Sequence, residues 1–125
     1  MRRHGFTLIE LMLAIVMLTI VLTGVARYTG QFLHAVATST TRTAAAQVAA
    51  ERIELVKTDP SYVNLTTTWA ETETGFPGYP DMTRVTLVAR ITGTTPARDY
   101  TVISVRVTEP TLPAPVNVTT TVGRP

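Results

Sequence analysis

The chain has 125 residues, no cysteine and a formal net charge of +2, which allow one small domain beside its apolar N-terminus. The lack of cysteine excludes disulfides, thiol catalysis and cysteine-ligated metals. Because Arg2 and Arg3 supply two of the 11 basic side chains, the rest of the chain balances nine basic groups against nine acidic ones. The sequence pI near 9.4 is therefore poor evidence for nucleic-acid binding. The 25 threonines favour extended structure rather than any particular chemistry.

The N-terminal segment is long enough to cross a membrane. Residues 6–26 form an apolar run with a single ionisable side chain, Glu10. A helix of that length extends about 30 Å, the thickness of a bilayer's hydrocarbon core. Arg2 and Arg3 precede the run and predict a cytoplasmic N-terminus.

Two general interpretations of this segment leave part of it unexplained. An ordinary signal peptide would be cut after Ala26, where Gly24-Val25-Ala26 has the small-x-small form. Its apolar stretch, however, would be shorter and free of acids. A plain single-pass anchor accounts for length and orientation but not for Glu10, because a charge within the apolar core costs about 2.5–3.5 kcal/mol on insertion.

A third interpretation uses all these features. The segment RRHGFTLIEL resembles the class III signal of type IV pilins and of the pseudopilins of type II secretion. The resemblance implies that prepilin peptidase cuts between Gly5 and Phe6 and N-methylates Phe6. Gly5 lets the peptidase approach the backbone without a Cβ. Arg2 and Arg3 keep the cut at the cytoplasmic face.

The same resemblance implies how the mature subunit assembles. Thr7 and Glu10 are the assembly positions, and Glu10 pairs with the new amine of Phe6 on an adjacent subunit, a use of buried charge to fix register. The implied partners are the peptidase/N-methyltransferase, other pilin or pseudopilin subunits, the inner-membrane assembly platform and membrane lipid. The implied location is the bacterial inner membrane with an extracytoplasmic head, or a cell-surface filament.

Residues 27–58 predict that the helix continues as an amphipathic half. They contain no proline, and an apolar stripe at helical spacing faces the head, while five charged residues are spaced as on a solvated surface. Lys57 and Asp59-Pro60 predict the helix end. Gly24 and Gly30 predict at most mild local melting. The stripe comprises Ala46, Ala49, Ile53 and Val56, widened by Val48 and Leu55; the charged residues are Arg42, Glu51, Arg52, Glu54 and Lys57; and Tyr28, Phe32 and His34 suit a membrane interface.

Residues 59–125 predict a small antiparallel sheet. Residues 59–83 read as a loop-rich connection, with a possible short strand in 61–69 and a turn at 75–80. Period-2 alternation predicts strands at 84–92 and 100–108 joined by a hairpin loop at 93–98, and a weaker strand at 116–122. The apolar faces comprise Val85, Leu87, Ala89 and Ile91 on the first strand and Thr101, Ile103, Val105 and Val107 on the second. The predicted fold is therefore α+β and pilin-like, with three to four strands covered by the helix stripe.

The sequence contains no enzyme constellation, and we expect no cofactor or metal. Glu71, Glu73 and Asp81 lack the fixed spacing of a calcium loop, so solvated acids are the better interpretation. Four arginines on the strands could form a weak basic patch for DNA, although alternating arginines more often mark a solvated face. These are Arg84, Arg90, Arg98 and Arg106.

These observations predict four segments and a structural role. Residues 1–5 form the leader, 6–26 the transmembrane or filament-core half of the helix, 27–58 its amphipathic half and 59–125 the head. We expect a minor pilin or minor pseudopilin of a type IV pilus or a type II secretion pseudopilus, and no enzyme. The alternatives are a competence pseudopilin involved in DNA uptake and a membrane-anchored binding module that does not enter filaments.

Overall fold

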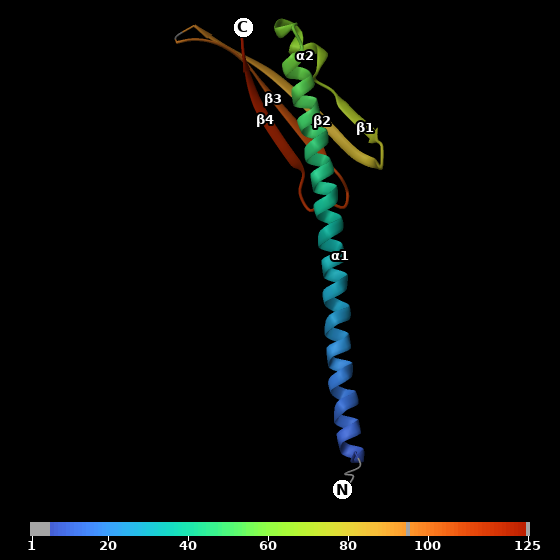
Figure 1. Ribbon diagram of the computed structural model, residues 1–125. Helices are drawn as coiled ribbons and strands as arrows, with labels where there is room; N and C mark the ends of the chain where they lie inside the picture. The colour runs from blue at the N-terminus through green and yellow to red at the C-terminus, as the bar shows by residue number, and fades with distance from the viewer. Residues whose placement is uncertain (1–5, 95, 125) are drawn as a thin grey trace. The chain divides into compact units, whose positions relative to one another are not determined.

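The computed structural model describes residues 6–94 and 96–124, which form a long helix and a four-stranded antiparallel sheet (Figure 1). The predicted α+β class and the predicted number of strands are confirmed. The sheet is a meander in which each strand pairs with the next one along the chain. The elements are α1 (Leu8–Thr58), η1 (Tyr62–Asn64), α2 (Leu65–Thr68), β1 (Thr72–Phe76), β2 (Tyr79–Thr94), β3 (Ala97–Thr108) and β4 (Val116–Gly123).

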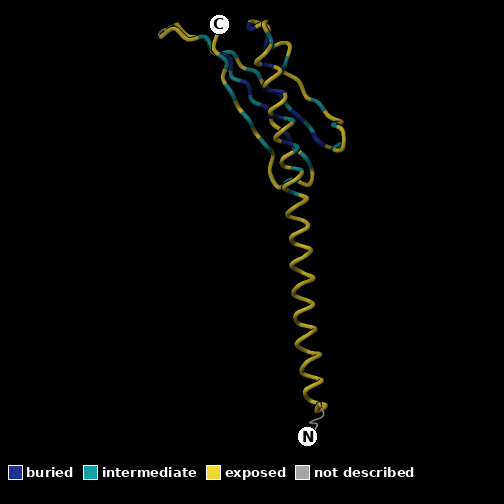
Figure 2. The backbone as a smooth tube through the Cα atoms, in the orientation of Figure 1, coloured by how far each residue is buried: buried dark blue, intermediate teal, exposed yellow. Residues whose placement is uncertain are grey.

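The chain divides into two compact units, and their boundary lies inside α1 between Ala37 and Thr38. In the first unit, every described residue is solvent-exposed (Figure 2). The second unit contains the rest of α1, the short helices and the sheet, and it holds all the buried residues. Only the second unit therefore has a hydrophobic core of its own.

Helix α1 begins and ends close to the predicted positions. The carbonyl oxygen of Thr7 accepts hydrogen bonds from the N–H groups of Glu10 (3.1 Å) and Leu11 (3.2 Å), which close the first turn. The helix ends at Thr58, with Lys57 in its last turn, where a cation suits the partial negative charge of the helix end. It is continuous through Gly24 and Gly30.

The core lies between the second half of α1 and one face of the sheet. The helix contributes Ala45, Ala49, Ile53 and Val56, and small alanines allow the sheet to approach closely. The predicted stripe was wrong at two positions, because Ala46 is exposed and Leu55 is 46% exposed. The remaining core residues are Tyr62, Leu65, Met82, Ile103, Val105 and Val107.

The connection after α1 contains short helices where the sequence suggested a strand. Tyr62 and Leu65 are three residues apart and both are buried, a spacing that places two side chains on one side of a helical turn. The indole Nε1 of Trp69 donates a hydrogen bond to Oδ2 of Asp59 at 2.6 Å and closes this segment onto the end of α1.

Strand β1 was not predicted from the sequence, although the turn after it was. The turn is closed by the pairing of Phe76 with Tyr79 around Pro77 and Gly78. Gly78 has a φ of +80°, and proline followed by such a glycine is the pattern of a type II turn. The loop predicted at 93–98 is shorter than expected, since β2 continues to Thr94 and β3 begins at Ala97.

The predicted buried face was correct for β3 and wrong for β2. On β3, Thr101, Ile103, Val105 and Val107 are all buried. On β2, the core side instead carries Met82, Arg84 and Thr86, which are buried, while Leu87 is 61% exposed and Ile91 is 41% exposed. Arg84 and Thr86 can occupy these buried positions because both form hydrogen bonds inside the head.

Candidate processing and assembly site

The described part of the first unit is an apolar helix without any covering partner. Its most hydrophobic 18-residue window has a mean hydropathy of 2.5, and none of that window is buried. By length and composition, α1 is the one helix among residues 6–94 and 96–124 that could cross a membrane. An uncovered apolar surface of this size requires lipid or other helices around it.

The start of this helix carries the predicted assembly residues. Phe6 is 81% exposed, and Glu10 lies exposed in the first turn of α1. A carboxylate in this position interacts favourably with the partial positive charge of the helix N-terminus. Within residues 6–94 and 96–124, no ion pair involves Glu10. The predicted leader residues Arg2, Arg3 and Gly5 lie outside the described residues.

Three threonine side chains of the first unit form hydrogen bonds with the backbone of their own helix. The hydroxyl groups of Thr19, Thr23 and Thr29 each donate a hydrogen bond to the carbonyl oxygen four residues earlier, at 2.8–2.9 Å. In a hydrocarbon environment, a hydroxyl without such a partner is costly. Glu10 is the sole acidic residue of this unit, and no described residue of the chain forms an ion pair with it.

In the head, two acidic residues considered for calcium contact arginines instead. Arg52 Nη2 lies 2.7 Å from Glu71 Oε1 and 3.4 Å from Glu73 Oε2, and Arg84 Nη2 lies 2.7 Å from the same oxygen of Glu73. Glu71, whose side chain is 50% exposed, and the exposed Asp81 are solvated as expected, whereas Glu73 is only 29% exposed and is shared by two arginines.

Arg52 was predicted to lie on a solvated surface but is only 5% exposed. Its Nε donates to the hydroxyl of Thr86 (3.2 Å), and its guanidinium stacks 4.7 Å from the ring centroid of Trp69. Arg84 donates to the carbonyl oxygen of Val48 (3.0 Å). This network links α1, β1 and β2, and no periodic pattern in the sequence predicts it.

The four strand arginines do not gather into one basic patch. Arg84 is buried in the network just described. Arg90 pairs with Asp99 through two hydrogen bonds of 2.9 and 2.7 Å. Arg106 donates to the side-chain oxygen of Asn117 (3.0 Å), and Arg98 is exposed near the end of the β2–β3 hairpin. Two of the four charges are thus neutralised by carboxylates.

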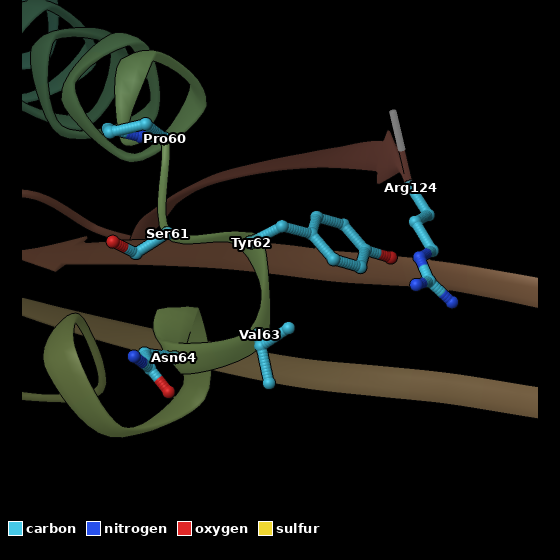
Figure 3. Close-up of a pocket in the computed structure, with 6 residues that line it drawn as sticks. All are labelled: Pro60, Ser61, Tyr62, Val63, Asn64 and Arg124. Carbon is cyan, nitrogen blue, oxygen red and sulfur yellow. The ribbon is translucent and has the colours of Figure 1, made fainter.

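An open pocket of about 370 Å³ lies beside the connection after α1 (Figure 3). Tyr62 points toward the guanidinium of Arg124, and Val63 and Asn64 line another side. The hydroxyl of Tyr62 donates to Asp99 (3.2 Å), whose pKa is lowered mainly by its hydrogen bonds with Arg90.

Within residues 6–94 and 96–124, no cluster of three or more metal-ligating side chains occurs.

Residues 1–26 match the family model described as the prokaryotic N-terminal methylation motif. No curated protein and no solved structure matches the chain. The motif, the long N-terminal helix and the small antiparallel sheet are together consistent with a type IV pilin-like protein. The motif supports a pilin-like or pseudopilin subunit that is processed by prepilin peptidase and assembles with other pilin subunits, and with the apolar helix it fits a membrane-anchored protein.

Proposed function

We propose that the chain is a minor pilin or minor pseudopilin, cleaved between Gly5 and Phe6, N-methylated at Phe6 and then packed through α1 into a type IV pilus or a type II secretion pseudopilus. The observation that carries this proposal is Glu10, an exposed acid in the first turn of an otherwise apolar and uncovered helix segment. A lone carboxylate there is costly in a membrane, so it calls for a cation from outside the chain.

The cation that fits is the α-amine that cleavage creates on Phe6 of a neighbouring subunit. Pairing it with Glu10 neutralises both groups as the helices pack, and only one axial offset between subunits brings them together. Thr7 lies between Phe6 and Glu10 in the sequence, and in this proposal it belongs to the same contact between subunits. In this proposal the subunit resides in the inner membrane with its head on the extracytoplasmic side.

The test compares Glu10→Ala with Glu54→Ala, which removes an exposed carboxylate from the head-proximal part of α1. Mass spectrometry of the N-terminus should find methylated Phe6 in both variants. The amount of the chain found in sheared filaments or pseudopili should fall at least tenfold for Glu10→Ala and stay unchanged for Glu54→Ala. Normal incorporation of Glu10→Ala would overturn the assembly role.

The same measurements separate the alternatives. An intact leader, or a cut after Ala26, would favour a membrane-anchored binding module outside filaments. Salt-dependent DNA binding by the head would favour a competence pseudopilin. Reading the neighbouring genes for an assembly ATPase, a peptidase and a secretin would distinguish a pilus from a secretion system.

A further inference from the structure

The two edges of the sheet differ in how they are protected against pairing with another strand. Edge strands in monomeric proteins are usually short, bulged, charged or covered. Strand β1 has five residues, a register shift between Thr74 and Phe76, and the charged Glu73, which two arginines hold. This edge is therefore closed to a further strand.

Strand β4 has none of these protections. Its eight residues, VNVTTTVG, contain no charge and no proline. Its pairing with β3 runs without a shift from Val116–Val107 to Gly123–Tyr100. In the strand order of the described residues, nothing pairs with its other side, and Figure 1 shows β4 at the border of the sheet.

The register identifies which backbone groups of β4 face outward. The N–H of Arg124 donates to the carbonyl oxygen of Asp99 (3.2 Å), which makes these two residues a hydrogen-bonded pair. Hydrogen-bonded and non-bonded pairs alternate along an antiparallel ladder. The even-numbered residues of β4 therefore bond to β3, and the outward N–H and C=O groups belong to Asn117, Thr119, Thr121 and Gly123.

We propose that β4 accepts a fifth strand, an extended and uncharged segment of a different subunit that runs antiparallel to it; that the partner is another subunit of the same assembly rests on the proposed function. Backbone hydrogen bonds to the four outward-facing residues would supply the affinity, as in other cases of strand addition. Because β4 carries no charge, it offers nothing to compensate a charged partner. On the core side, Val118 and Val122 are only half-buried, and apolar side chains on the new strand would cover them.

A second copy of this chain fits this edge poorly. Figure 1 shows β4 running in the same direction as the second half of α1. Copies whose α1 helices run parallel therefore also have parallel β4 strands, whereas antiparallel pairing is the more stable arrangement. The remaining free edge of a second copy is β1, which is short, bulged and held by Arg52 and Arg84.

The first test uses the full chain in detergent micelles and an octapeptide of alternating valine and threonine, flanked by lysines for solubility. Hydrogen exchange should slow at least tenfold at the amides of Asn117, Thr119, Thr121 and Gly123 when the peptide is added. The amides of the even-numbered residues between them, which already bond to β3, should change little. A uniform change along β4, or none, would overturn the proposal.

Proline at position 119 provides a matched variant. Thr119→Pro removes one outward N–H without breaking the β3–β4 ladder, and proline is tolerated where a strand's N–H faces solvent. Thr119→Ala keeps that N–H and loses the same contact with the hydroxyl of Ser104 (3.1 Å). Peptide affinity should fall at least tenfold for Thr119→Pro and stay unchanged for Thr119→Ala. Equal binding by both would overturn the proposal. If Thr119→Pro does not fold, the hydrogen-exchange pattern of the unmodified chain with the peptide decides the question.

The partner is tested in cells with a photo-crosslinking residue at the exposed Asn117. The expected adduct joins the chain to a different subunit that carries an N-terminal methylation motif, and Thr119→Pro should abolish it. An adduct with the mass of two copies, also lost in Thr119→Pro, would overturn the assignment of the partner. The peptide experiment does not require cleavage of the leader, so its outcome is independent of the proposed role of Glu10.

Discussion

The head depends on two arginines that lie almost wholly inside it. Arg52 is 5% exposed and holds Glu71 and Glu73 across the gap between α1 and β1. Arg52→Met should lower the free energy of unfolding by about 2 kcal/mol, because the buried hydroxyl of Thr86 loses its hydrogen-bond donor and the half-exposed Glu71 loses its partner. Urea unfolding followed by the fluorescence of Trp69, the sole tryptophan, measures this loss.

The control is Lys57→Met, which breaks the ion pair with Glu54 on the exposed side of α1 (2.9 Å). A surface pair three residues apart on a helix contributes about 0.5 kcal/mol or less. Equal losses in Arg52→Met and Lys57→Met would show that the buried network does not hold β1 in place.

The pair formed by Asp99 and Arg90 makes the head sensitive to acid. Hydrogen bonds from Arg90 hold the pKa of Asp99 below its ordinary value near 3.8. A lowered carboxyl pKa stabilises the folded state above the unfolded pKa, and this stabilisation is lost as the pH falls through the folded pKa. Asp99→Asn should therefore lower the unfolding temperature by a constant amount between pH 5 and pH 8.

That difference should begin to shrink below about pH 4, where the carboxyl of the unfolded chain takes up a proton, and should approach zero once the pH has fallen below the lowered pKa of folded Asp99. Asp81→Asn, at an exposed position on β2, is the matched control and should leave the unfolding temperature unchanged at every pH. A difference for Asp99→Asn that grows in acid would mean that the charge of Asp99 does not stabilise the folded head.

Among the secondary-structure elements, β2 offers the clearest test of which face is buried. Met82 is fully buried, whereas Leu87 on the opposite face is 61% exposed. Met82→Ala should cost about 2–4 kcal/mol of folding free energy, since it removes contacts and leaves a cavity. Leu87→Ala should cost about 0.5 kcal/mol or less. The reverse order in urea unfolding would show that the face predicted from the sequence is the buried one.

The sequence predicted those elements whose side-chain periodicity matches their burial. On β3, the residues buried against α1 are mostly branched and apolar, so alternation predicted both the strand and its face. On β2, the buried face carries Arg84 and Thr86, whose partners come from β1 and α1. Such partners are defined only by the folded chain, so a period-2 pattern chose the wrong face.

Strand β1 and the short helices escaped prediction for a related reason. Strand β1 consists of five residues, and its Thr-Glu-Thr-Gly-Phe sequence carries one apolar side chain, Phe76. Its position is fixed by arginines of other elements rather than by an apolar face of its own. The turn after it was predicted because proline and glycine act locally.

For the molecule as a whole, the sequence predicted more about the N-terminal unit than about the head. The methylation motif covers residues 1–26, where the order of Gly5, Phe6 and Glu10 carries the information. The head has no such motif, and its open edge on β4 became visible only from the strand order and register. Processing and assembly can therefore be proposed from the sequence, whereas a partner of the head required the structure.

The apolar N-terminal unit and the head should respond independently to a charge placed in the apolar stretch. Val16 lies near the middle of the apolar stretch and is 56% exposed. Val16→Arg would place a charge inside the hydrocarbon core, at a cost of about 2.5–3.5 kcal/mol. The fraction of the chain that remains with the membrane after alkaline extraction should therefore fall severalfold.

The head has its own core, so the unfolding temperature measured through Trp69 should be the same for Val16→Arg and for the unmodified chain. Gln47→Arg, which adds the same charge at an exposed position of α1 in the second unit, should change neither quantity. Full membrane retention of Val16→Arg would mean that residues 6–26 do not lie in the hydrocarbon core. A lowered unfolding temperature would mean that the two units fold together.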